Sequence, residues 1–164
     1  MALNKRRISI KCGDIFEIKL KNSKKYFQFV LKNIDYMDGD LIRGFYFECN
    51  SNYKPQIDEI LNSGITAYTH TWIKPGIKEG FWEKIGNVQI EQGFESPFFR
   101  QTNDHLPQVQ KSHNWFIWKG DIDNKIDIGE LTDKYRKLPL SGINTPASII
   151  KWIEKGDAAF KKPN

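Results

Sequence analysis

The sequence predicts an α+β domain, in which a mainly antiparallel, strongly bent β-sheet or partial barrel carries a C-terminal helix packed on it. Two observations indicate this class. Near the N-terminus, three segments alternate apolar and polar residues with the period of two that is typical of strands. Near the C-terminus, apolar residues recur at the i, i+3, i+4, i+7 spacing of an amphipathic helix. Turn-forming residues connect the strands, so we expect an antiparallel meander.

The meander comprises residues 15–20, 26–34 and 41–49. Its first strand places Phe16 and Ile18 on one face, opposite charged residues. The alternation in the other two strands predicts a single buried aromatic face, made of Phe27, Phe29, Phe45 and Phe47.

Shorter elements follow the meander. Pro55 suits the first position of a helix over 55–63, and Gly64 suits its end. Further strands are expected at 66–73, 82–90, 98–101 and 115–119, and a helical turn or two at 128–138. The loop Phe94–Phe99 either plugs the core or forms an apolar contact patch, and both alternatives stay open.

The last helix has the clearest signals of the chain. Thr145 is a suitable N-cap, Pro146 suits the first helical position, and Gly156 suits the end. Ile149 and Ile153 lie on its apolar face. The chain shows no internal repeat and no linker, so we expect one domain over residues 1–164, with a frayed basic arm at 1–8 and a frayed tail at 157–164.

The composition excludes a membrane-spanning, fibrous or disordered chain. Of the 164 residues, 39% are hydrophobic and 13% are aromatic. No apolar run approaches the roughly 18 residues that a membrane span needs. The N-terminus is basic but has no apolar segment of signal-peptide length, which predicts a cytoplasmic location. Cys12 and Cys49 are accordingly expected to be reduced thiols.

Catalytic and metal-binding patterns are missing from the sequence. The three histidines match no metal or catalytic spacing, and the glycines are too far apart for a phosphate loop. The acidic segment 121–130 fails as an EF-hand because Lys125 and Ile126 occupy its fifth and sixth positions. We therefore expect neither a cofactor nor an enzyme activity.

The N-terminal residues resemble a known family. Lys11-Cys12-Gly13-Asp14 leads directly into the strand Ile15–Leu20, and the aromatic strand Tyr26–Leu31 follows after a polar turn. This arrangement is similar to the opening of the immunity protein 26 family of bacterial polymorphic toxin systems. The resemblance implies a largely β fold and a non-enzymatic protein that binds and neutralises a cognate toxin in the cytoplasm.

The charge distribution suggests where such a toxin binds. The net charge is +5, yet residues 34–130 carry nine basic and fifteen acidic side chains. Many toxins of this kind act on nucleic acid and have basic active sites, which an acidic patch could occupy. The candidate partner-binding residues are Asp121, Asp123, Asp127 and Glu130, followed by Asp35, Asp38 and Asp40.

The alternative function is a small β-barrel nucleic-acid-binding module. Its cationic candidates are Lys5, Arg6, Arg7, Lys24 and Lys25. Tyr26 and Tyr46 are the aromatic side chains that this alternative leaves for base stacking. It predicts binding that weakens steeply with salt.

Overall fold

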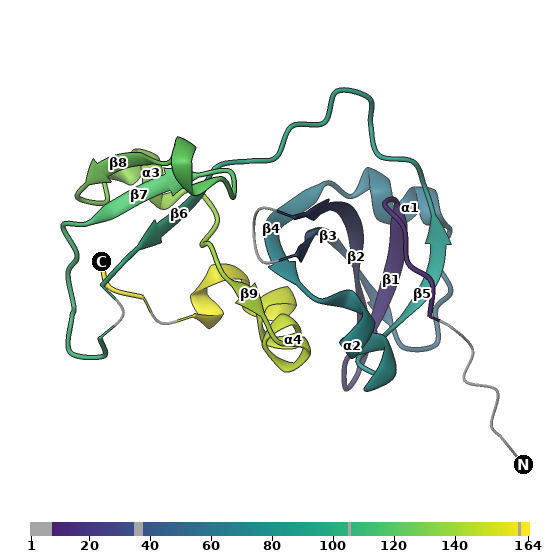
Figure 1. The fold of residues 1–164 in the computed structure, drawn as a ribbon. Coiled ribbons are helices and arrows are strands. Elements are labelled where there is room, and N and C mark those ends of the chain that lie inside the picture. Colours follow the sequence, from purple (N-terminus) through teal and green to yellow (C-terminus); the bar gives the residue numbers. More distant parts are fainter. Residues whose placement is uncertain (1–7, 35–37, 105, 161) are drawn as a thin grey trace, which may run out of the picture.

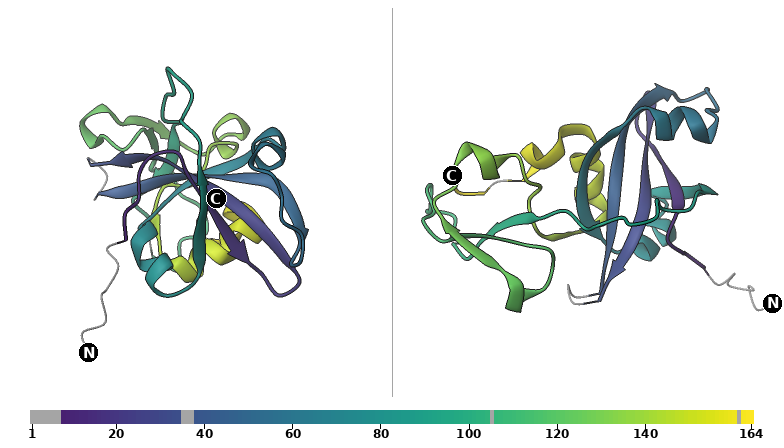
Figure 2. Two further views of the ribbon diagram at one scale, coloured as in Figure 1. Left: turned by 90° about the vertical axis from the view of Figure 1, so that its right-hand side faces the viewer. Right: turned by 90° about the horizontal axis from the view of Figure 1, so that it is seen from above.

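The computed structural model describes residues 8–34, 38–104, 106–160 and 162–164. A larger sheet has the strand order β5-β1-β2-β3-β4-β9, and a three-stranded sheet has the order β6-β7-β8. Helix α4 (Pro146–Lys155) lies between the two sheets (Figure 1). Figure 2 shows the same arrangement from the side and from above.

The larger sheet confirms the predicted meander and the α+β class. Its strands are β1 (Asp14–Lys19), β2 (Ser23–Asn33), β3 (Gly39–Asn50), β4 (Ile65–Thr71), β5 (Trp82–Asn87) and β9 (Ile143–Asn144). All neighbouring strands are antiparallel except β4 and β9, which are parallel. The sheet is bent by irregularities in the pairing of β2 with β3, and its edge strands do not pair, so it is not closed.

The predicted single aromatic face is wrong. Phe27 pairs with Gly44 and Phe29 with Ile42, and directly paired residues point to the same face of a sheet. Phe45 therefore points to the opposite face, where it packs with Tyr26. Alternation within a strand gives the side-chain period but not the register against its neighbour, which here includes bulges.

Both faces of the meander are consequently covered. On one face, a core cluster joins Phe16, Phe27 and Phe29 to Trp152 and Ile153 of α4. Helix α2 (Ile73–Lys78) completes this side. Gly44 lets α4 approach, because a Cβ there would lie 3.2 Å from Ile153 and Trp152 and 2.8 Å from the Thr66 hydroxyl.

The opposite face of the meander has two apolar regions. Helix α1 (Ile57–Asn62) places Ile60 on Tyr26 and Phe45. The small sheet covers the other region with side chains of β6 (Phe99–Thr102) and β7 (Trp115–Trp118). Phe99 is 1% exposed, and Phe94 packs on the same cluster, so the loop Phe94–Phe99 contributes to the core.

Several shorter elements differ from the sequence-based expectation. The strand expected at 66–73 ends at Thr71, and the helix α2 follows at once. Strand β8 (Ile126–Gly129) lies in the acidic segment 121–130. It overlaps the helical turns expected over 128–138, which are reduced to α3 (Asp133–Arg136). Pro55 precedes α1, whose N-cap is Gln56.

The C-terminal helix is as predicted. The Thr145 side chain accepts a hydrogen bond from the Ser148 backbone N–H, and Pro146 begins the helix. After α4, a short 3-10 helix spans Gly156–Ala159. Asn164 pairs through its backbone with Gln110 and Ser112, at 2.8 and 2.7 Å. The single-domain organisation stays a prediction.

Candidate partner-binding surface

The structure divides the predicted acidic residues into two groups. Asp121, Asp123, Asp127 and Glu130 lie in and beside the β7–β8 hairpin, whereas Asp38 and Asp40 lie at the start of β3. Asp35 is outside the described residues. The first group is called here the acidic edge, together with Ile122 and Ile126 between its carboxylates.

Asp121 has a structural role in the acidic edge. Its carboxylate accepts a hydrogen bond from the backbone N–H of Asp123 and another from the Asn124 side chain. These bonds cap the 3-10 helix Ile122–Asn124, which turns the chain from β7 into β8. Asp123 is exposed at the tip of this turn.

The other two carboxylates of the acidic edge have cationic neighbours from the same chain. Asp127 is 3.2 Å from the Lys125 ammonium. Glu130 is 3.2 Å from the Lys111 ammonium and 2.8 Å from the His113 imidazole. The hydrogen bond from Lys111, with a smaller contribution from His113, holds the pKa of Glu130 below its usual range. All of these pairs are at the surface, where such ion pairs are weak and exchangeable.

Exposed apolar side chains accompany these carboxylates. Ile122 is 56% exposed and Ile126 is 49% exposed. Aspartate and isoleucine alternate in the sequence here, although only the acids carry a charge that predicts a basic partner. An exposed isoleucine beside carboxylates combines an apolar anchor with charges that select a basic partner.

The edge of the small sheet is also open along β8. Among the described residues, β8 pairs only with β7, whereas β6 on the other side is bridged to Leu140. An unpaired strand edge presents backbone N–H and C=O groups that can pair with a strand of another protein.

Asp40 and Asp38 differ from the acidic edge in burial. The Asp40 carboxylate is buried, accepts a 2.8 Å hydrogen bond from the Ile73 backbone N–H, and lies 3.4 Å from the Lys32 ammonium. It thereby fixes the start of α2 against β3. Asp38 is exposed at the turn, where its φ of 55° is left-handed.

A buried ionic network, which the sequence did not reveal, lies on the larger sheet. The Lys24 ammonium is 3.3 Å from the Glu17 carboxylate, and the Tyr26 hydroxyl donates a 3.2 Å hydrogen bond to the same carboxylate. Burial raises the pKa of Tyr26. Lys24 also donates to the Tyr53 carbonyl, so the charged groups are paired and hydrogen-bonded, as buried charges must be.

This network bears on the nucleic-acid alternative. Lys24 and Tyr26 are both buried, so neither is available to a phosphate or a base. Tyr46 is 67% exposed, while Lys5, Arg6 and Arg7 lie outside the described residues. The stacking platform that the alternative requires therefore loses one of its two aromatic side chains.

The described residues contain no group of three His, Cys, Asp or Glu side chains arranged to hold a metal ion. His70 is buried against Phe99, with the ring centroids 4.8 Å apart, and burial lowers its pKa to about 4. Within the described ranges, no helix has the length and hydropathy to cross a bilayer.

Comparison with known proteins identifies the family. The family model for Immunity protein 26 matches residues 11–110, which is more than half of the chain. The chain belongs to the immunity protein 26 family. This confirms the resemblance seen at Lys11–Leu20, and the family name indicates a protein that protects against a toxin. No curated protein and no solved structure matches the chain.

The extent of the family match separates the molecule into two parts. Residues 11–110 include β1 to β6 and both short helices that pack on the larger sheet. The acidic edge begins at Asp121, after the match ends. The framework of this immunity protein is thus family-like, whereas its acidic edge lies in the part that the family model does not cover.

Proposed function

We propose that this immunity protein binds and neutralises a cognate bacterial toxin in the cytoplasm, without catalysis, and that the acidic edge is its toxin-binding surface. The observation that carries the proposal is the combination of exposed carboxylates, exposed isoleucines and an open strand along β8. These are the elements of a protein interface, with an apolar centre and a charged rim.

The charge of the acidic edge supports a basic partner. Residues 121–130 carry four carboxylates and one lysine, although the whole chain has a net charge of +5. A local field opposite to that of the rest of the chain orients an approaching basic protein toward this edge. A toxin that acts on nucleic acid needs a basic active site to hold phosphates, and the carboxylates would occupy that site in place of the phosphates.

The position of the acidic edge supports specificity for one toxin. Immunity requires a surface that differs between relatives with different toxins. The acidic edge lies outside residues 11–110, which the family model matches. A framework shared by the family accounts for family membership, and a separate recognition edge accounts for specificity toward one toxin.

Co-expression tests the protective function. The gene adjacent to this one is expressed in a naive bacterium with and without this chain, and survivors are counted. We expect the adjacent gene to kill and this chain to rescue. Killing that this chain does not reduce would contradict the proposal.

Charge reversal tests the surface. The variant Asp123→Lys/Asp127→Lys alters the exposed acids and leaves the cap at Asp121 intact. We expect it to bind the purified toxin at least about tenfold more weakly, chiefly through slower association. The matched control is Glu79→Lys/Glu154→Lys, which makes the same charge change at exposed positions elsewhere and should keep wild-type affinity.

A further inference from the structure

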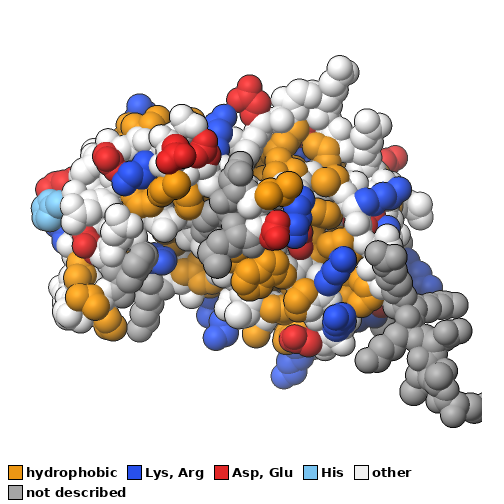
Figure 3. All heavy atoms as spheres, viewed as in Figure 1, with side chains coloured by type: hydrophobic (Ala, Val, Ile, Leu, Met, Phe, Trp, Pro, Cys, Tyr) orange, Lys and Arg blue, Asp and Glu red, His pale blue; other side chains and the backbone are white. Residues whose placement is uncertain are grey.

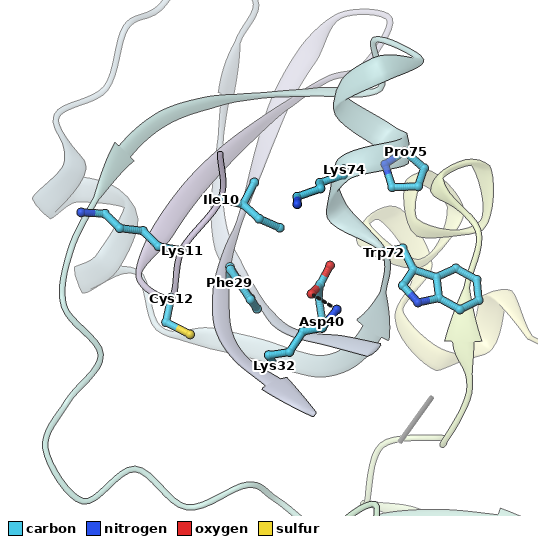
Figure 4. Close-up of a pocket in the computed structure, with 9 residues that line it drawn as sticks. All are labelled: Ile10, Lys11, Cys12, Phe29, Lys32, Asp40, Trp72, Lys74 and Pro75. Atoms are coloured by element: carbon cyan, nitrogen blue, oxygen red, sulfur yellow. Dashed lines mark hydrogen bonds and ion pairs between the residues drawn. The ribbon is translucent and has the colours of Figure 1, made fainter. Parts of the chain in front are cut away.

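A pocket lies on the larger sheet, within the family-matched part of the chain. It has a volume of about 770 Å³, within the range of small-molecule sites. Figure 4 shows nine residues that line it, from the lead-in to β1, from β2 and β3, and from the β4–α2 junction. In the space-filling view, hydrophobic side chains gather on this part of the surface with lysine or arginine side chains around them (Figure 3).

The pocket combines apolar walls with a cationic rim. Its apolar lining comes from Ile10, Phe29, Trp72 and Pro75. Phe29 is buried in the core beneath, whereas Trp72 is 39% exposed. Three lysines and one aspartate carry the charges of the lining: Lys11, Lys32, Lys74 and Asp40.

The lysines and the aspartate are not equivalent. The Asp40 carboxylate accepts a hydrogen bond from the Ile73 backbone N–H. It also forms an ion pair with Lys32, which Figure 4 marks with a dashed line. Among the described residues, neither Lys11 nor Lys74 has a carboxylate within ion-pair distance. In Figure 4 the Lys74 side chain points toward Ile10, across the pocket. The excess charge of the pocket is therefore positive.

The backbone explains why Trp72 and Lys74 meet at this pocket. Trp72 is the N-cap residue of α2, at the point where β4 turns into the helix. The hydrogen bond from Ile73 to Asp40 fixes that turn against β3. Asp40 is thus a positioning residue for the segment that carries both Trp72 and Lys74.

We propose that this pocket binds a small organic anion with an aromatic body, such as an aryl carboxylate, sulfonate or phosphate. The aromatic body would lie against Ile10 and Phe29, with Trp72 at the edge of the pocket. The anionic group would be held by Lys74, whose ammonium points across the pocket, whereas the Lys11 ammonium points outward (Figure 4). A concave site with mostly apolar walls and few charged groups suits a compact ligand better than an extended protein segment. This ligand site is separate from the acidic edge and does not depend on the toxin.

Fluorescence titration of the full chain tests the site, with anilinonaphthalene sulfonate as the anionic probe and phenyl-naphthylamine as its neutral counterpart. We expect saturable binding of one anionic probe per chain. The variant Lys74→Glu should weaken binding of the anionic probe about tenfold or more and change binding of the neutral probe less than about twofold. The variant Trp72→Ala should weaken binding of both probes.

The control variant Lys151→Glu makes the same charge change at an exposed position outside the pocket and should bind both probes as the wild type does. Circular dichroism verifies that each variant is folded, and Trp72→Phe, which keeps an aromatic wall, should restore most of the affinity. Absence of saturable binding, or equal weakening by both lysine variants, would overturn the proposal. So would stronger binding of a Glu-Phe-Glu peptide than of the anionic probe, because it would assign the pocket to a protein segment.

Discussion

The Glu17–Lys24 pair of the larger sheet and the ion pairs of the acidic edge on the small sheet differ in burial. In the larger sheet, Glu17 and Lys24 are paired in the interior, and both faces of the meander are covered. In the small sheet, the ion pairs of Asp127 and Glu130 lie at the surface beside an open strand. Buried pairs fix a structure because breaking them is expensive, whereas exposed pairs can exchange partners. This difference is the basis of our proposal that the small sheet carries the recognition surface.

The largest expected effect is at the buried pair. Lys24→Met leaves the Glu17 carboxylate buried without its cation and should lower the free energy of unfolding by about 3–5 kcal/mol. Urea denaturation measures the change. The double variant Glu17→Met/Lys24→Met removes both charges and should recover most of the loss. If Lys24→Met alone had no effect, the larger sheet would not be held by buried charge.

Acid should destabilise the protein through His70 of β4, whose ring packs on Phe99 of β6 in the other sheet. Burial lowers its pKa from 6.5 to about 4 in the folded state. Between these values the unfolded chain binds a proton that the folded chain does not, so stability is full above pH 6.5 and falls as the pH decreases toward 4. The loss from this group approaches roughly 3 kcal/mol at the acid end of the window.

Urea denaturation from pH 7.5 down to about pH 4.5 measures this dependence. His70→Leu should make the free energy of unfolding depend less on pH in this window. Above the window, the difference in stability between wild type and variant should not change with pH. A variant with the same pH dependence as the wild type would show that another group is responsible.

A smaller effect is expected at the contact between β3 and α4. Gly44→Ala places a methyl group 2.8 Å from the Thr66 hydroxyl and 3.2 Å from Trp152 and Ile153. Overpacking of this kind should lower the free energy of unfolding by about 1–3 kcal/mol. Lys151→Ala, at an exposed position of the same helix, is the control and should change it by less than about 0.5 kcal/mol. A stable Gly44→Ala protein would mean that α4 is not docked on β3 as described.

The smallest effect is expected at the exposed pair of the small sheet. Lys111→Met removes one cation from Glu130, and both side chains are more than half exposed. The free energy of unfolding should change by less than about 1 kcal/mol. The same denaturation experiment measures it, and a loss as large as that of Lys24→Met would remove the distinction between the two sheets.

The sequence predicted the elements whose signals are local. The alternation in residues 15–49 gave the meander, and Thr145, Pro146 and Gly156 gave the limits of α4. The start of α2 was not predictable in this way, because Asp40 binds the Ile73 backbone N–H from 33 positions earlier in the chain. The burial of Glu17 and Lys24 also depends on tertiary packing, since Glu17 alternates as a solvent-facing position does and Lys24 lies in the polar turn before the strand expected at 26–34.

Only part of the candidate site was predictable, because only part of it depends on local sequence. The aspartates at 121–127 are local features of the sequence, but the strand edge that presents them exists only because β8 pairs with β7. The pocket beside Trp72 combines residues from four segments between Ile10 and Pro75, so no local pattern could identify it.

The binding constant of the purified toxin for the wild type and for Asp123→Lys/Asp127→Lys, measured at low and at high salt, tests the central claim most directly. We predict at least about tenfold weaker binding of the variant at low salt, a smaller difference at high salt, and wild-type binding by Glu79→Lys/Glu154→Lys. Equal affinity of the wild type and Asp123→Lys/Asp127→Lys for a toxin that this chain neutralises would contradict the claim that the acidic edge is the recognition surface.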